Sequence, residues 1–176
     1  MIAYRLTNRL SDFSTNVSTE AVVAFEQQGA ARPGEMIAIH NGIDTRAFAF
    51  DSDTREGVRA ELALGEATPL FLAVGSLCEQ KDYPNLLRAF ARLADDEPVP
   101  HLAIVGDGRL RAELEGLAES LGVTSRVRFL GIRYDIPALM AACDLFVLSS
   151  AWEGFGLVVA EAMACERLVV ATDCGG

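Results

Sequence analysis

The sequence predicts an α/β fold with a doubly wound parallel sheet, and three of its features indicate that fold class. From about Thr68 onward, short apolar runs of strand-like composition alternate with segments of helical periodicity, which is the pattern of repeated β-α units. The ends of the apolar runs are rich in glycine, as expected where a strand turns into a helix. Hydrophobic residues occupy 51% of the 176 positions, which is ample for a folded core.

Five short apolar runs are expected to be the strands of this sheet. They are residues 70–74, 101–105, 127–130, 145–148 and 168–171. Their length and their valine, isoleucine and leucine content favour strands that are buried on both faces. Because helical segments separate them, we expect the strands to lie parallel.

Four helices are predicted between the strands. The first has an apolar stripe at helical spacing, a proline near its start and another beyond its end: Leu86, Leu87, Phe90, Leu93, Pro84 and Pro98. The second has leucines at i, i+4, i+7 and i+11 and a glycine stop: Leu110, Leu114, Leu117, Leu121 and Gly122. The last two are expected over residues 136–142 and 157–165.

Residues 1–67 are interpreted as the end of a preceding domain and a linker, with the main domain over residues 68–176. The chain stops at Gly176, directly after a buried strand, where a doubly wound domain normally continues into another helix. We therefore expect a fragment whose main domain is incomplete at its C-terminus. Three elements are predicted in the first part: a helix over residues 19–28 capped by Ser18 or Thr19, a strand over residues 36–40, and a charged helix over residues 51–64 that ends at Gly65.

The charge and cysteine content argue against several classes of partner. Fifteen basic and twenty-five acidic residues give a formal net charge of −10, and the basic residues are not clustered, so no nucleic-acid partner is expected. The four cysteines are widely spaced without a CxxC pair, so neither a zinc site nor a disulfide framework is expected. No apolar run reaches transmembrane length and the start lacks a secretory pattern, so we expect a cytoplasmic protein.

The residues that follow the strands are the candidates for ligand binding, because open parallel sheets bind ligands beyond the carboxyl ends of their strands. The first strand leads into Gly75-Ser76 and then Lys81, and the second leads into Gly106-Asp107-Gly108. The fourth leads into Glu153-Gly154-Phe155-Gly156 and a helix that begins at Leu157. Glycines at a helix start expose backbone N–H groups which, with the helix dipole, favour a diphosphate or sugar hydroxyls.

Three charged side chains in these segments are assigned to binding, against simpler alternatives. Glu161 lies about one turn into the last helix, where its carboxylate can accept ribose hydroxyls or merely complement the helix dipole. Glu153 precedes the glycines and is placed to hold hydroxyls of a sugar. Lys81 is the one lysine in a chain whose other cations are arginines, so we interpret it as a phosphate contact rather than a solvated surface amine.

The remaining patterns in the sequence give weaker indications of a functional site. The run that starts at Gly106 partly matches the dinucleotide fingerprint, but Arg111 stands where the third glycine belongs, which argues against a dehydrogenase. Gly106 and Gly108 then make a tight turn or line a base pocket. His40 and His101 are single histidines and are interpreted as packed or capping residues. No metal-binding carboxylate cluster is visible, so no metal ligands are predicted.

The order of these motifs closely resembles the C-terminal half of the family 4 retaining glycosyltransferases, which have the two-domain GT-B fold. The resemblance runs from about Asn16 to Gly176. Each motif is weak alone, but their order and spacing are specific. The motifs are Asn41-Gly42-Ile43-Asp44, Val74-Gly75 with Lys81, Ile104-Val105-Gly106-Asp107-Gly108, Phe129-Leu130-Gly131, Asp144-Leu145-Phe146-Val147-Leu148-Ser149, Glu153-Gly154-Phe155-Gly156-Leu157 with Glu161-Ala162-Met163, and Val170-Ala171-Thr172-Asp173 with Gly175-Gly176.

This resemblance implies a donor site for a nucleotide-diphosphate sugar. Lys81 is implied to contact the diphosphate, Glu161 the ribose, and Ile132 with Arg133 the base. Where such enzymes pair this lysine with an arginine, the chain has Ser76, which halves the charge neutralisation of the diphosphate. The implied donor-binding residues are Gly75, Ser76, Lys81, Gly106, Gly131, Ile132, Arg133, Glu153, Gly154, Phe155, Gly156, Leu157 and Glu161, with Glu153 and Lys81 as the catalytic candidates.

The resemblance also implies the reaction. It is the transfer of a sugar from the nucleotide-diphosphate donor to an acceptor with retention of anomeric configuration, without a cofactor or an obligatory metal ion. The acceptor, a sugar, lipid or glycan, is implied to bind through the N-terminal domain, and peripheral association of the full-length protein with the inner face of the membrane is compatible with this. We expect the chain alone to bind nucleotide without transferring sugar.

Two further hypotheses stay open. A nucleotide-sugar epimerase of the same fold would share the donor site. A non-catalytic nucleotide-binding or interaction module would share the fold without the reaction, and Ser76 is the best argument for it.

Overall fold

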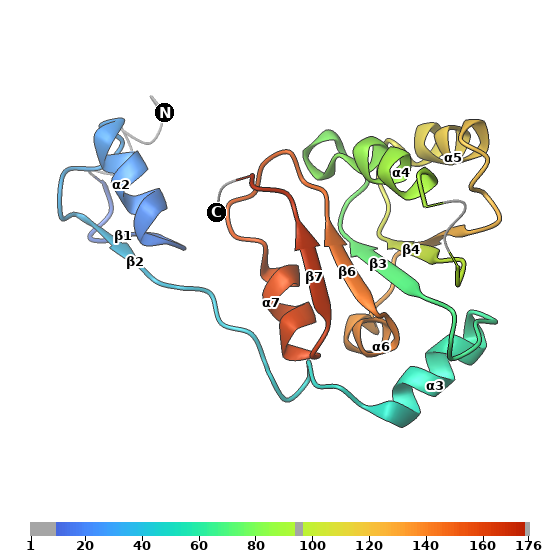
Figure 1. Cartoon of the computed structure of the whole chain (residues 1–176). Helices are drawn as coiled ribbons and strands as arrows, with labels where there is room; N and C mark the ends of the chain where they lie inside the picture. The colour runs from blue at the N-terminus through green and yellow to red at the C-terminus, as the bar shows by residue number, and fades with distance from the viewer. Residues whose placement is uncertain (1–9, 94–96, 175–176) are drawn as a thin grey trace. The chain divides into compact units, whose positions relative to one another are not determined.

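The computed structural model describes residues 10–93 and 97–174 (Figure 1). The chain forms two units. The smaller takes in the chain up to Gly42 together with Glu153–Leu157, and the larger takes in Ile43–Trp152 and Val158–Cys174. Gly175 and Gly176, which belong to the last of the family motifs, lie outside the described residues.

The larger unit is built on a five-stranded sheet that confirms the predicted fold class. Its strands are β3 (Leu70–Val74), β4 (His101–Val105), β5 (Val127–Gly131), β6 (Leu145–Leu148) and β7 (Leu168–Ala171). They follow the order β5-β4-β3-β6-β7, and every neighbouring pair is parallel. The strand order reverses between β3 and β6, and the crevice beyond such a switch point is where open α/β sheets bind ligands.

Helices cover both faces of this sheet (Figure 1). One face carries α4 (Tyr83–Ala91) and α5 (Arg111–Ser120), and the other carries α3 (Ser52–Glu61), α6 (Ile136–Ala142) and α7 (Leu157–Ala164). Successive residues of each strand point to opposite faces. On β4, for example, Leu102 and Ile104 join the core under α4 and α5, whereas Ala103 and Val105 join the core under α3, α6 and α7.

Two helices were predicted to end at a glycine, and the structure confirms one of these two ends. Helix α5 stops as expected, because Gly122 takes a left-handed φ of 70° and the Val123 N–H bonds to the Ala118 carbonyl at 3.0 Å. Helix α3 ends at Glu61 and not at residue 64. There Ala63 takes the left-handed position with φ of 50°, so the turn closes before Gly65 is reached.

Helix α3 belongs with the sheet, although the sequence placed residues 1–67 before the main domain. The larger unit begins at Ile43. Val58 and Leu62 are buried in the same core as Leu139 and Met140 of α6. Burial of this apolar face stabilises α3 against the sheet unit.

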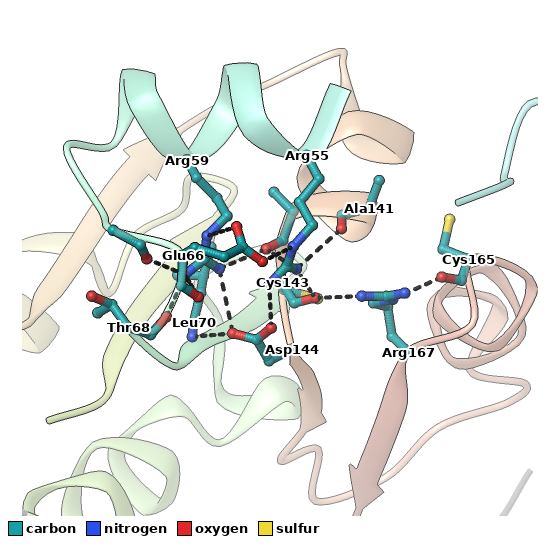
Figure 2. A network of polar contacts seen from close by, with 12 residues as sticks. Arg55, Arg59, Glu66, Thr68, Leu70, Ala141, Cys143, Asp144, Cys165 and Arg167 are labelled. Carbon is teal, nitrogen blue, oxygen red and sulfur yellow. Dashed lines mark hydrogen bonds and ion pairs between the residues drawn. The ribbon is translucent and has the colours of Figure 1, made fainter. Parts of the chain in front are cut away.

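A network of arginines ties α3 to the amino ends of β3 and β6 (Figure 2). Asp144, just before β6, accepts a hydrogen bond from the Leu70 N–H at 2.8 Å and ion pairs from Arg55 Nη2 at 2.6 Å and Arg59 Nη1 at 3.3 Å. Arg59 is only 2% exposed and also donates to the carbonyls of Gly65 and Ala142. The guanidinium groups thus satisfy carbonyls at the end of α6 that have no partner within the helix.

The smaller unit contains β1 (Ser14–Asn16), α2 (Thr19–Gln27) and β2 (Met36–Ala38), with the two strands parallel. Ser18 is the N-cap as predicted, since its Oγ accepts a hydrogen bond from the Ala21 N–H at 3.1 Å. Strand β2 ends at Ala38, before the predicted end at residue 40, and β1 was not predicted.

Over the described ranges, no helix is both long enough and apolar enough to cross a membrane.

Candidate functional site

The loops after β3 and β4 are pressed together at the carboxyl edge of the sheet. The Gly75 N–H donates to the Val105 carbonyl at 2.9 Å, and the Leu77 N–H donates to the Asp107 carbonyl at 3.0 Å. A β-carbon on Gly106 would stand 2.1 Å from the Gly75 carbonyl oxygen, and one on Gly108 would stand 2.5 Å from the Leu77 carbonyl oxygen. These glycines are therefore required by backbone packing between the two loops.

Lys81 lies at the end of a short 3-10 helix, η2 (Glu79–Lys81), and its position is fixed from two sides. Its side chain packs over Gly75, where an added β-carbon would come within 2.8 Å of Lys81 Cε. Its carbonyl accepts a hydrogen bond from Ser149 Oγ, just after β6, at 2.7 Å. Lys81 is thus held between the carboxyl ends of β3 and β6, at the switch point of the sheet.

Tyr83 supports the same corner and was not singled out from the sequence. Its side chain is buried, and its hydroxyl donates to the Gly75 carbonyl at 3.1 Å. The hydroxyl would also stand 3.3 Å from a β-carbon on Gly75. A buried tyrosine at the start of a helix gave no sequence signal that separates this role from ordinary core packing.

Ser76 follows Gly75 and is exposed. A hydroxyl can donate one hydrogen bond to a phosphate but supplies no positive charge. The expected shortage of positive charge next to β3 therefore stays a prediction.

Glu161 lies on α7 and is half-buried. Burial raises the pKa of its carboxyl group above the ordinary glutamate range. A partly desolvated carboxylate gains from accepting hydroxyl hydrogen bonds, which is the chemistry predicted for a ribose contact.

The loop after β5 carries the residues predicted to border a base. Gly131 takes a left-handed φ of 68°, and its carbonyl accepts the Gly106 N–H at 2.8 Å, which joins this loop to the one after β4. Ile132 is 64% exposed. Arg133 is held by two carboxylates, with Nη1 at 2.6 Å from Glu61 and Nη2 at 2.6 Å from Asp135. The Glu61 partner lies 72 residues away in α3 and left no sequence signal.

The structure thus brings seven of the predicted residues to the carboxyl ends of the strands in the larger unit: Gly75, Ser76, Lys81, Gly106, Gly131, Ile132 and Arg133. Glu161 belongs to the same unit and lies on α7. The remaining five, Glu153, Gly154, Phe155, Gly156 and Leu157, belong to the smaller unit. Within that segment, α7 begins at Leu157 as predicted, so N–H groups of its first turn have no partner within the helix.

His101 and the cysteines take structural places, whereas His40, which was interpreted as a packed or capping residue, is exposed. His101 begins β4, at the strand end opposite to the glycine loops, and burial together with Arg128 and Arg126 lowers its pKa. All four cysteines are free thiols, and burial raises the pKa of Cys143 to about 12. In the described part of the chain, no group of three or more His, Cys, Asp or Glu residues could hold a metal ion.

Comparison with known sequences connects this geometry to a family. A family model described as "Glycosyl transferases group 1" matches residues 54–176. The chain is 39% identical over 180 residues to the lipopolysaccharide core biosynthesis glycosyltransferase LpsE of Rhizobium meliloti, covering 96% of this chain and 50% of that protein. It is 30% identical over 167 residues to the N-acetyl-alpha-D-glucosaminyl L-malate synthase of Bacillus anthracis, covering 94% of this chain and 42% of that protein.

Solved structures show the same similarity to glycosyltransferases. Anabaena Alr3699/HepE, in complex with UDP and glucose, matches with a TM-score of 0.89 and 33% identity over 99% of this chain and 48% of that one. WaaG, a glycosyltransferase involved in lipopolysaccharide biosynthesis, matches with a TM-score of 0.83 and 28% identity over 99% of this chain and 52% of that one. These neighbours share the Rossmann-like sheet of the GT-B fold. The chain spans about half the length of these relatives.

Proposed function

Because the chain belongs to the group 1 glycosyl transferases, we propose that it binds the nucleotide-diphosphate sugar of such an enzyme at the carboxyl edge of its five-stranded sheet. The observation that carries this proposal is the position of Lys81. Its side chain is packed over Gly75 and its backbone is bonded to Ser149, so a cation is held at the switch point of the sheet. An ammonium group there is suited to the diphosphate of the donor.

The proposed reaction breaks the bond between the anomeric carbon and the diphosphate oxygen, and the nucleoside diphosphate leaves with the electron pair. A hydroxyl oxygen of the acceptor forms the new bond to the anomeric carbon and gives up its proton. Stabilising the charge of the leaving diphosphate is the main task of the protein. We assign it to Lys81 of the larger unit. The motif order alone assigns the backbone N–H groups of Phe155 and Gly156 to the same donor. This assignment asks for neither a cofactor nor an obligatory metal ion. Glu161 would hold the ribose, and Glu153 would hold the transferred sugar.

The donor class and the stereochemistry are proposed on different grounds. UDP is the first nucleotide to test, because Alr3699/HepE was solved in complex with UDP and glucose. Retention of anomeric configuration and membership of family 4 are inferred from the order of the motifs that run from Asn41 to Gly176. A sugar, lipid or glycan acceptor would bind to a part of the whole enzyme that corresponds to the half of the relatives not spanned by this chain.

Because that half is proposed to hold the acceptor, the chain alone is expected to bind nucleotide without transferring sugar. Sugar transfer by the chain alone, measured with UDP-glucose and a panel of acceptors, would contradict this division of roles.

A second candidate is a non-catalytic nucleotide-binding or interaction module. It is favoured by one observation, the exposed Ser76 where the family resemblance implies an arginine. An interaction module would bind no nucleotide, and a non-catalytic nucleotide-binding module would differ from the first candidate in lacking the reaction.

A panel of nucleotides tests the proposal. The melting temperature of the protein is measured with UDP, GDP, ADP and NAD, since a ligand that binds only the folded state raises it. We expect UDP or another nucleoside diphosphate to raise it in a saturable manner. A response to NAD alone would point to a dinucleotide-binding domain, and no response to any of the four would point to an interaction module.

A further inference from the structure

The loop after β6 is bonded to η2 at three of its residues. The Ser149 Oγ donates to the Lys81 carbonyl at 2.7 Å, and the Ala151 N–H donates to the Gln80 carbonyl at 2.8 Å. The Trp152 carbonyl accepts a hydrogen bond from Gln80 Nε2 at 3.1 Å. Two consecutive residues of η2 therefore hold this loop up to Trp152.

The same two segments are also held by their other neighbours. Ser150 is buried, and its carbonyl accepts a hydrogen bond from Thr172 Oγ1, just after β7, at 2.5 Å. On η2, Glu79 forms an ion pair with Arg109 of the loop after β4. All of these contacts lie within the larger unit. The turn that carries Lys81 and the loop after β6 are thus one connected support at the carboxyl ends of the strands.

The side chain of Gln80 controls the last contact of this support. Its amide donates to the carbonyl of the peptide unit that joins Trp152 to Glu153. Because a peptide unit is planar, a fixed direction of that carbonyl also fixes the direction of the Glu153 N–H. Gln80 thereby sets the orientation in which the chain leaves the loop at Trp152.

The orientation of this peptide bears on ligand binding. Glu153, which follows Trp152 directly, is the residue that the motif order assigns to the transferred sugar. A segment that is ordered before its ligand arrives does not lose that conformational freedom on binding. A fixed peptide before Glu153 therefore favours binding of the sugar.

We propose that Gln80 is a positioning residue for the donor sugar, because its side-chain amide holds the peptide before Glu153. This role rests on the proposed function, since it requires a nucleotide sugar as the ligand. Lys81, the next residue in the chain, keeps its packing over Gly75 and its bond to Ser149 whatever side chain stands at residue 80. The side chain of Gln80 therefore affects binding of the sugar and not binding of the diphosphate.

Gln80→Met tests this role, because methionine has a similar length and cannot donate a hydrogen bond. Calorimetry measures the affinity of UDP and that of the most tightly bound donor among UDP-glucose, UDP-galactose and UDP-N-acetylglucosamine. We expect Gln80→Met to weaken the UDP sugar about fivefold and to leave UDP unchanged. The control Gln27→Met, an exposed change in α2, should alter neither affinity.

The fluorescence of Trp152 gives a second readout that needs no ligand, because Trp152 is the one tryptophan of the chain. We expect Gln80→Met to lower its fluorescence anisotropy at unchanged melting temperature, and Gln27→Met to leave it unchanged. Equal effects of Gln80→Met on UDP and on the UDP sugar, or an unchanged anisotropy, would overturn the positioning role while the proposed function stands. If the wild type bound neither ligand, the proposed function would fail and the positioning role with it.

Discussion

The side chain of Lys81 lies so close to Gly75 that a β-carbon at residue 75 would stand 2.8 Å from Lys81 Cε. The glycine and the lysine are therefore one structural feature. The absence of a side chain at the end of β3 is what lets the one lysine of the chain fold back over the switch point.

Gly75→Ala is expected to displace the lysine and weaken nucleotide binding. The added methyl group meets the end of the Lys81 side chain, so the ammonium group should move. Because Gly75 has a φ of 157°, alanine there also strains the backbone, and the free energy of unfolding is therefore measured beside UDP affinity. Loss of one charge-assisted hydrogen bond corresponds to about 1.5 kcal/mol, or about tenfold in the dissociation constant of UDP. Calorimetry measures this change.

Gly57→Ala is the matched control, because a β-carbon there meets nothing within 4 Å. Gly57 lies inside α3, so alanine should raise the free energy of unfolding by up to about 1 kcal/mol and leave UDP affinity unchanged. Equal UDP affinity in Gly75→Ala and the wild type would show that the contact between residues 75 and 81 has no part in binding.

Ser76→Arg is expected to strengthen binding of UDP several-fold. It would add a second positive charge beside the diphosphate, and the gain should shrink as salt screens the charge. Titrations at low and high ionic strength measure it. Ser120→Arg adds the same charge at the end of α5 and should not tighten binding. An equal gain from both variants would mean that only net charge matters.

Arg59→Leu is expected to lower the free energy of unfolding by about 1 to 3 kcal/mol. Arg59 is almost fully buried, and its removal takes away one of the two arginine partners of Asp144 and the side-chain donor to the Gly65 carbonyl. Urea denaturation measures the change. Arg88→Leu removes an exposed arginine of α4 and should change stability by less than about 0.5 kcal/mol. Similar values for both variants would contradict the role given to the network.

Glu161→Gln is expected to change how stability depends on pH. Because burial raises the pKa of Glu161 in the folded protein, the folded state binds this proton more tightly than the unfolded state. Its contribution to stability is therefore present at low pH and is lost as pH rises from the ordinary value of 4.5 through the folded pKa.

Urea denaturation at pH 4 and pH 7 tests this sign. The free energy of unfolding of Glu161→Gln minus that of the wild type should be more positive at pH 7 than at pH 4. The affinity of the variant for UDP should fall. Glu113→Gln, an exposed change in α5, is the control. A Glu161→Gln variant that is less stable at pH 7 than at pH 4, relative to the wild type, would contradict the burial argument.

The strands of the sheet could be predicted from sequence because their signal is local. Residues 70–74 and 101–105 are continuous apolar runs, and β3 and β4 have those bounds. The glycines of the strand ends were likewise visible. What they contact was not, because Gly106 is required by the carbonyl of Gly75 on a neighbouring strand.

The contacts made by α3 could not be predicted either, because they too join residues that are far apart in the sequence. Its helical pattern is visible in the sequence, but Arg59 reaches the Ala142 carbonyl and Arg133 reaches Glu61 across more than seventy residues of chain. Such contacts depend on how the sheet closes, which no local pattern encodes. The roles given to Glu153, Phe155 and Gly156 stay predictions.

Titration of the protein with UDP by calorimetry, for the wild type and Lys81→Met in buffer with a metal chelator, tests the central claim most directly. We predict saturable binding of one UDP to the wild type without added metal, and a loss of at least tenfold in Lys81→Met at unchanged melting temperature. Equal binding of UDP by both proteins, or none by the wild type, would contradict the assignment of this sheet edge as a donor site.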